Sequence, residues 1–292
     1  MIVFWQALVS GIAVGVIYAL IALGFNIIFQ TTRIINFAQG EFVMIGALAG
    51  YSLTVVLGLP ILLALVGVAL ISALVGVLTE RMVMAPIQRS TYRYSWIITT
   101  LAVAIILRNL MGTDWLYGRE DYRVPPLVSG VFFVGPVVVA YQQVIIFIIA
   151  LLLLVLIELF YQRTFLGKAI RATAFNYNVA SLMGIPVPMM IQASFAMSAA
   201  VSGIAGVLVA PLIFANVSMG ILIGLKGFVA IILGGLGSPR GAVIGGLIVG
   251  LLDTTVRVLA PEGWGNFIVF GILALVLLIR PGGLFGKPDS RH

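Results

Sequence analysis

The sequence contains no cysteine, and its single histidine, His292, stands at the last position. The lack of cysteine excludes disulfides, thiolate catalysis and cysteine metal sites, and one histidine cannot build a histidine metal cluster. A Ser/His/Asp or Cys/His catalytic set is excluded in the same way. We therefore expect no catalytic or metal-binding constellation of these types, and we predict that the chain is not an enzyme.

Charged residues are scarce as well, at 9% of the 292 residues, where an average soluble domain has about a quarter. A nucleotide-binding loop is also missing. Gly167-Lys168 lacks the upstream glycine and the following Ser or Thr of a Walker A motif. If the protein works with ATP and Mg²⁺, another subunit must bind them, so we expect no cofactor on this chain.

Hydrophobic residues, in contrast, make up 62% of the sequence. A soluble fold of this size could not hide so much apolar surface, whereas lipid accepts it. The apolar runs lack strand alternation and are near the length of about 20 residues that crosses a bilayer as a helix. We predict an all-α membrane protein, a polytopic bundle of about eight or nine transmembrane helices in one domain, 1–292. The predicted spans are 5–29, 41–58, 60–78, 95–112, 141–161, 186–210, 221–236, 242–259 and 266–280.

The net charge of +7 is explained better by membrane topology than by nucleic-acid binding. Lysine and arginine residues lie mostly in the connections on one side of the predicted spans. Cytoplasmic loops of membrane proteins are enriched in these residues. We therefore expect an N-terminus outside, a C-terminus in the cytoplasm and about nine crossings. The basic residues used here are Arg33, Arg81, Arg89, Arg93, Arg163, Lys168, Arg171, Arg240, Arg280, Lys287 and Arg291.

Glycines and polar breaks repeat weakly along the chain. Gly11–Gly15 leads to the polar segment 36–40, and Gly203–Gly206 leads to a polar stretch and then to Gly224–Gly227. Repeated halves with interrupted helices are common in transporters, so we predict a pseudo-repeat with broken or re-entrant helices at 41–58 and 221–236. Glycines four residues apart predict close helix packing, or alternatively gliding surfaces: Gly46/Gly50, Gly241/Gly245 and Gly246/Gly250.

Polar residues within the apolar segments are the first candidates for function. Asn36, Gln39, Gly40 and Glu41 open an apolar helix, where they either line a transport pathway or simply begin a helix at the membrane surface. Asp253 and Arg257 are four residues apart and can form an intramembrane ion pair on one helix. Such residues are costly in a membrane and face protein or water; a purely structural role is the alternative for each.

The connection 163–185 is the strongest local signal. Its apolar and basic residues alternate at helical spacing, and it is long enough for a helix-turn-helix outside the bilayer. An amphipathic helix in the cytoplasm suits docking into a groove of a partner protein, or else it rests on the lipid surface.

Several segments resemble one family. They are Gly-Val-Ile-Tyr-Ala-Leu-Ile-Ala-Leu-Gly-Phe (15–25), Ile-Ile-Asn-Phe-Ala-Gln-Gly-Glu-Phe (34–42), Gly-Lys-Ala-Ile-Arg-Ala (167–172), Leu-Met-Gly-Ile (182–185), Gly-Leu-Lys-Gly-Phe-Val-Ala-Ile-Ile-Leu-Gly-Gly-Leu-Gly-Ser (224–238) and Arg-Pro-Gly-Gly-Leu-Phe-Gly (280–286). In this order, nearly end to end, they resemble LivH-type permeases of branched-chain amino acid ABC importers. The resemblance implies a type II-like importer permease in a prokaryotic inner membrane.

The resemblance also implies partners: a LivM-like paralogous permease, two cytoplasmic ATPase subunits, and an extracytoplasmic binding protein that delivers Leu, Ile or Val. It implies that 163–185 couples to an ATPase through Gly167, Lys168, Arg171, Ala172, Asn176, Leu182 and Gly184. The pathway candidates become Asn36, Gln39, Gly40, Glu41, Lys226, Gly234, Gly235 and Gly237. Gln39 stands where the family usually has histidine, although glutamine keeps the capacity to hydrogen bond.

Three other functions remain open from the sequence. One is a stand-alone ion- or proton-coupled carrier, against which the lack of a chain of membrane carboxylates argues. Another is an ABC permease for urea or amides, because the binding protein largely sets the solute. The third is a membrane scaffold or enzyme, which would need a catalytic set or a large soluble domain.

Overall fold

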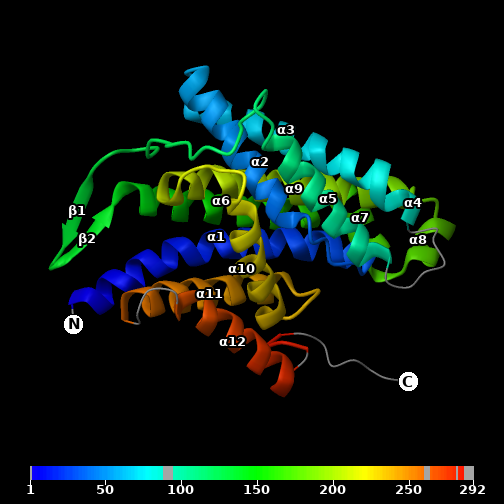
Figure 1. The fold of residues 1–292 in the computed structure, drawn as a ribbon. Coiled ribbons are helices and arrows are strands. Elements are labelled where there is room, and N and C mark those ends of the chain that lie inside the picture. The colour runs from blue at the N-terminus through cyan, green and yellow to red at the C-terminus, as the bar shows by residue number, and fades with distance from the viewer. Residues whose placement is uncertain (1, 88–94, 260–263, 281, 286–292) are drawn as a thin grey trace. The chain divides into compact units, whose positions relative to one another are not determined.

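The computed structural model describes residues 2–87, 95–259, 264–280 and 282–285 (Figure 1). Several residues used in the topology argument, namely Arg89, Arg93, Lys287, Arg291 and the terminal His292, lie outside the described residues.

Every predicted span coincides with a helix in the described residues, and the ends differ by only a few residues. The runs are helical because lipid offers no hydrogen bonds, so each backbone group must be paired within its own segment. Two short π-helical segments, η1 (Ser52–Val56) and η2 (Glu80–Met84), extend the second and third helices. The bounds are α1 (Ile2–Thr32), α2 (Gln39–Tyr51), α3 (Ile61–Thr79), α5 (Ser95–Met111), α6 (Tyr141–Arg163), α9 (Val187–Ile213), α10 (Met219–Gly234), α11 (Pro239–Leu259) and α12 (Trp264–Ile279).

Six of these helices in the described part of the chain are long and apolar enough to cross a membrane: α1, α2 with η1, α3 with η2, α6, α9 and α11. The apolar helices α5, α10 and α12 are shorter. The remaining helices are short connections: α4 (Ala85–Ile87), α7 (Phe165–Phe175) and α8 (Tyr177–Leu182). The predicted polytopic helical membrane fold is therefore confirmed.

The stretch 127–140 is apolar but too short to span a membrane as a helix. In the structure it contains a β-hairpin, with β1 (Val131–Val134) antiparallel to β2 (Val137–Ala140) (Figure 1). Its strands are rich in valine and phenylalanine, which favour extended backbone. Gly135 at the turn has φ +59, a conformation that glycine adopts without steric cost.

The chain forms two compact units, each built from separate stretches of sequence. Unit 1 combines Met1–Asn26, Pro125–Leu152 and Leu225–His292, and unit 2 combines Ile27–Val124 and Leu153–Gly224. Three of the four boundaries fall inside α1, α6 and α10, and the fourth, between Val124 and Pro125, falls in the connection between α5 and β1. Three continuous helices therefore pass from one unit to the other.

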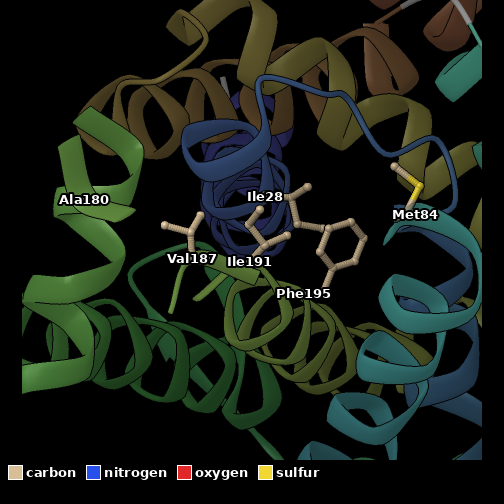
Figure 2. Close-up of a cluster of buried hydrophobic side chains, with 6 residues drawn as sticks. All are labelled: Ile28, Met84, Ala180, Val187, Ile191 and Phe195. Carbon is tan, nitrogen blue, oxygen red and sulfur yellow. The ribbon is translucent and has the colours of Figure 1, made fainter. Parts of the chain in front are cut away.

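The core of unit 2 is built around α9, which contacts both α2 and α3. One cluster of fully buried side chains joins the end of α1, η2, α8 and α9 (Figure 2): Ile28, Met84, Ala180, Val187, Ile191 and Phe195. Glycines bring α2 and α9 into backbone contact, because a Cβ added at Gly46 would overlap the Gly203 backbone, and one at Gly206 would overlap Val43. Such close approach supplies packing energy between helices in lipid.

Unit 1 uses the same device. A Cβ at Gly250 would overlap the Gly15 backbone, so α11 lies directly against α1. A Cβ at Gly245 would overlap Ala230, so α11 also lies against α10. The glycine pairs noted in the sequence are thus sites of helix packing, as their spacing predicts.

Candidate translocation and coupling sites

The break between α1 and α2 carries the first set of predicted residues. Arg33 ends α1 with φ +57, and α2 begins at Gln39. Within the break, Asn36 accepts a hydrogen bond at Oδ1 from the Ala38 backbone N–H at 3.1 Å. This bond satisfies one of the free N–H groups at the start of a helix, while Asn36 Nδ2 is buried without a hydrogen-bond partner among the described residues.

Gln39 joins α2 to α9. Its Nε2 donates to Ser198 Oγ at 2.9 Å and to Ser202 Oγ at 2.6 Å, and its Oε1 accepts from Ser198 at 3.2 Å. The side chain is fully buried. The predicted pathway residue therefore lies inside a helix contact of unit 2, and the two serines that complete this cluster were not predicted.

Gly40 and Glu41 lie against α10 and α5. A Cβ added at Gly40 would overlap the Gly220 carbonyl, so the start of α2 touches the start of α10. The Arg108 side chain on α5 donates to Glu41 Oε1 in an ion pair. Glu41 Oε2 and Arg108 Nε are buried, and neither has a hydrogen-bond partner among the described residues. The structure thus brings Arg108 on α5 to Glu41 on α2.

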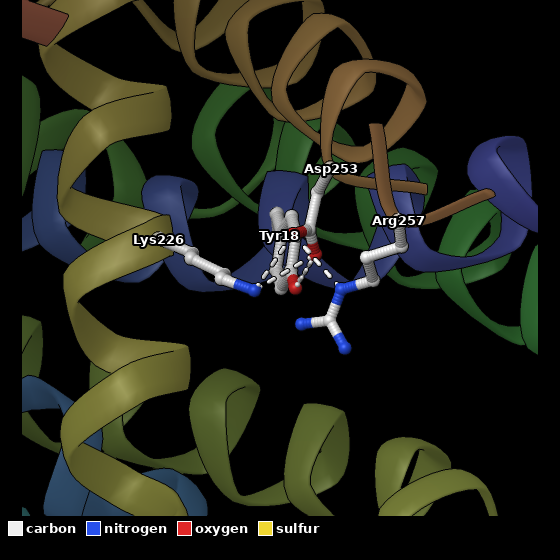
Figure 3. A network of polar contacts seen from close by, with 4 residues as sticks. All are labelled: Tyr18, Lys226, Asp253 and Arg257. Carbon is white, nitrogen blue, oxygen red and sulfur yellow. Dashed lines mark hydrogen bonds and ion pairs between the residues drawn. The ribbon is translucent and has the colours of Figure 1, made fainter. Parts of the chain in front are cut away.

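Lys226 and Asp253 form the centre of a separate network in unit 1 (Figure 3). Lys226 Nζ lies 2.9 Å from both carboxylate oxygens of Asp253. Tyr18 donates its hydroxyl to Oδ2 at 2.9 Å, and Arg257 donates Nε to Oδ1 at 3.1 Å. The network joins α1, α10 and α11. Lys226 was predicted as a pathway residue, whereas the structure places it with the predicted pair Asp253–Arg257.

Tyr18 is the member of this network that the sequence analysis missed. A tyrosine in an apolar helix needs a partner for its hydroxyl group, which is a usable signal for a polar site. The signal does not identify the partner, because Tyr18 and Asp253 are 235 positions apart.

The remaining predicted pathway residues form the turn between α10 and α11. Gly235 and Gly237 have φ +103 and +84, values that favour glycine. The Gly234 carbonyl accepts from the Phe285 backbone N–H at 3.0 Å, and its Cα lies against Gly241. These glycines are thus used for a tight turn, about two helical turns along α10 from Lys226.

The segment 163–185 folds into the two short helices α7 and α8. Thr164 accepts from the Gly167 N–H at 2.9 Å and caps α7, and Asn176 accepts from the Val179 N–H at 3.1 Å and caps α8. Gly184 follows α8 with φ +80. The predicted helix-turn-helix is therefore present, and its caps explain where each helix begins.

Two predicted coupling residues hold this segment to α6. A Cβ at Gly167 would overlap the Phe160 carbonyl, so α7 lies directly against the end of α6. Arg171 donates Nη2 to the Tyr161 carbonyl at 2.5 Å, which satisfies a carbonyl near the C-terminus of that helix. Gly167 and Arg171 therefore position the segment, while Lys168 and Ala172 are exposed.

The exposed side of α7 and α8 carries large apolar side chains. Phe175 is 91% exposed and Leu182 is 88% exposed, with Phe165 and Met183 close to these values. The opposite side buries Ala169, Ile170 and Ala180. We call Phe165, Phe175, Leu182 and Met183 the apolar patch. Leu182 was predicted, and the other three were missed although each is a large apolar residue beside a polar face. Exposed apolar patches often mark interaction sites.

The sequence matches the family model described as "Branched-chain amino acid transport system / permease component" over residues 7–277. It is 32% identical to the high-affinity branched-chain amino acid transport system permease protein BraD of Pseudomonas aeruginosa, covering 98% of this chain and 97% of BraD. It is 31% identical to LivH of Escherichia coli, a protein with the same description, over 98% of this chain and 96% of LivH. The probable LivH of Methanocaldococcus jannaschii is 30% identical, over 91% of this chain and 88% of that protein.

A solved structure, PsaBC from Streptococcus pneumoniae in complex with Fab, has a similar fold, with a TM-score of 0.50 and 15% identity. The match covers 99% of this chain and 93% of that one. The sequence match to the permeases runs nearly from end to end. The chain is therefore a member of the family of permease components of branched-chain amino acid transport systems.

Proposed function

We propose that this chain is the membrane-spanning permease subunit of an ATP-driven importer of branched-chain amino acids, Leu, Ile and Val or closely related ones. The family match and the end-to-end likeness to permeases of branched-chain amino acid transport systems support this function. The observation in the structure that carries the proposal is the apolar patch on α7 and α8, which connect two spanning helices but are themselves too short to span.

The apolar patch suits a protein partner better than water. Four large apolar side chains project from helices whose caps and buried face fix their position. Exposed apolar anchors on a rigid helix are the features that drive docking into a groove. In our proposal this partner is a cytoplasmic ATPase, which binds the ATP and Mg²⁺ for which this chain has no Walker A loop.

The proposed complex contains this chain, a LivM-like second permease, two ATPase subunits and an extracytoplasmic protein that delivers the amino acid. The N-terminus lies outside and the C-terminus in the cytoplasm of a prokaryotic cell, following the distribution of basic residues. The solute passes along the interface of the two permeases. Asn36–Glu41 and Gly234–Gly237 become accessible when the packed helices move between two arrangements, whereas Lys226 stays paired with Asp253.

The docking role is tested with the double variant Phe175→Ala/Leu182→Ala. Leu278→Ala is the matched control, because Leu278 on α12 is 86% exposed but lies outside the patch. The variants are expressed with all partners and purified through this chain. Since truncating a central apolar anchor commonly costs about 2 kcal/mol or more, we expect the copurified ATPase to fall at least roughly tenfold in the double variant. The control should retain it.

Lys168→Glu is a second variant, which reverses the charge of an exposed side chain on α7 outside the apolar patch. Arg171 is left unchanged, because it also donates a hydrogen bond to the Tyr161 carbonyl. Uptake of leucine into vesicles should fall while membrane insertion stays normal. If Phe175→Ala/Leu182→Ala retains all of the copurified ATPase and takes up leucine normally, the docking role is contradicted. Uptake by vesicles that contain this chain without any ATPase would favour a stand-alone carrier instead.

A further inference from the structure

The ion pair of Glu41 and Arg108 has unused bonding capacity. Glu41 is 2% exposed, and only its Oε1 is paired; Oε2 has no partner among the described residues. Arg108 Nε is also buried without a partner. A buried charged group normally has its hydrogen-bonding capacity filled, so an acceptor and a donor left open beside one ion pair are unusual.

The unpaired oxygen faces a position where the chain has no side chain. A Cβ added at Gly220 would lie 3.1 Å from Glu41 Oε2 and 2.6 Å from the Gly40 carbonyl oxygen. The start of α10 therefore packs closely against the start of α2 beside Glu41 Oε2. Glycine at residue 220 allows this approach without placing a side chain on the unpaired oxygen.

Arg108 is the more exposed member of this pair. Its side chain is 27% exposed, whereas that of Glu41 is 2% exposed. The guanidinium carries five N–H donors and the ion pair uses one of its nitrogen atoms, Nη2. Arg108 can therefore bind an incoming anionic group while Glu41 remains available to a cationic one.

The chemistry of an amino acid matches these open groups. Its α-ammonium is a donor and its α-carboxylate is an acceptor, and the two are joined. When such a head group inserts between Glu41 and Arg108, one ion pair becomes two, and the net charge of the site does not change. A solute with a single charge would leave one buried group uncompensated, which is costly away from water.

We propose that Glu41 and Arg108 form a binding site in this chain for the zwitterionic head group of the transported amino acid. Glu41 Oε2 accepts from the α-ammonium group, and the Arg108 guanidinium donates to the α-carboxylate. The inference rests on the proposed function and adds the residues that select an amino acid over an uncharged or singly charged solute.

The test uses the complete transporter in proteoliposomes, with leucine-loaded binding protein outside and ATP supplied to the ATPases. The measured quantity is the leucine taken up per ATP hydrolysed, together with the amount of assembled complex. Three variants are compared: Glu41→Gln, Glu41→Gln/Arg108→Gln, and Glu80→Gln as the matched control. Glu80 is another buried carboxylate of unit 2, and it accepts from Gln192 at 3.4 Å.

We expect both Glu41 variants to lose at least roughly tenfold in leucine per ATP, the effect of losing a charge-assisted hydrogen bond. ATP hydrolysis and the amount of complex should change less than about twofold, and Glu80→Gln should resemble the wild type. The double variant is decisive, because it leaves no unpaired charge. A purely structural pair predicts that the double variant regains normal uptake.

Recovery in the double variant, or unchanged uptake in both, overturns the proposal. Loss of the complex in both variants assigns the pair to folding and overturns it as well. A wild-type transporter that takes up no leucine would defeat the proposed function and this site together. If the wild type imports leucine and the Glu41 variants import it equally well, this site alone is refuted.

Discussion

Glu41 and Asp253 are both 2% exposed and both ion-paired, but the two carboxylates differ in how many donors they meet. Asp253 receives hydrogen bonds at both oxygens, from Lys226, Tyr18 and Arg257. Glu41 is paired with Arg108 at one oxygen, and its other oxygen is unpaired. One carboxylate is saturated by its own chain and the other is left with open capacity.

The difference indicates two kinds of buried charge. A fully satisfied polar network stiffens the helices that it joins, here α1, α10 and α11 of unit 1. A partly satisfied pair costs stability, and proteins keep such a cost mainly where function requires it. We therefore assign the Asp253 network to the framework of unit 1 and the Glu41 pair to solute binding in unit 2.

The comparison is tested most directly by neutralising each carboxylate with its amide. Asp253→Asn leaves Lys226 charged and buried without a counterion, and breaking a buried pair in this way costs about 3–5 kcal/mol. Glu41→Gln should cost closer to about 1 kcal/mol, since Arg108 is partly exposed and can turn toward water. The apparent free energy of unfolding in detergent and SDS measures both.

In leucine transport the order of the two variants should be reversed, with the larger loss of uptake in Glu41→Gln. The Asp253→Asn complex that survives purification should take up leucine per ATP as the wild type does, whereas the Glu41→Gln complex should not. Equal losses of stability in the two variants would contradict the distinction between a framework network and a binding pair. Lys226→Met/Asp253→Leu is the control, because removing both charges should recover much of the stability.

How far the sequence predicts these sites depends on the separation of the residues along the chain. Asp253 and Arg257 are one helical turn apart, so their pairing follows from helix geometry alone. Lys226 lies 27 positions before Asp253, and Gln39 lies 159 positions before Ser198. Nothing local encodes such meetings, because they depend on which helices pack together.

The fold was more predictable than the sites because it depends on run length and apolar composition. Each span is visible as a predominantly apolar run near the length that crosses a bilayer, and lipid forces such runs to be helical. Segments with other constraints were harder to predict. The hairpin at 131–140 is apolar like the spans, and its turn at Gly135 distinguishes it only weakly. Gly234–Gly237 forms the turn between α10 and α11, and its role as pathway lining stays a prediction.

A second prediction concerns the seam that carries Glu41. Gly46→Ala would push a methyl group into the Gly203 backbone and force α2 away from α9, at a cost of about 1–3 kcal/mol. Because Gln39 and Glu41 lie on the same helix, leucine uptake should fall together with stability. Gly271→Ala is the control, since no described atom lies within 4 Å of its added Cβ and alanine favours helices. A neutral Gly46→Ala would show that the seam does not support the Glu41 site.

The smallest effect is expected at the exposed edge of the Asp253 network. Arg257 is bonded to Asp253 Oδ1 at 3.1 Å, but its side chain is 57% exposed, so water replaces much of what the bond contributes. Arg257→Gln should lower the free energy of unfolding by less than about 1 kcal/mol, and the loss should shrink as salt is raised. Unfolding of the wild type and of the variant is compared at low and at high salt. Lys226 still meets both carboxylate oxygens in this variant. If Arg257→Gln lost as much stability as Asp253→Asn, and salt did not change that loss, the stability of the network would depend on its total number of donors rather than on Lys226. Glu41, which has a single partner, would then have too few donors to be kept as a structural ion pair.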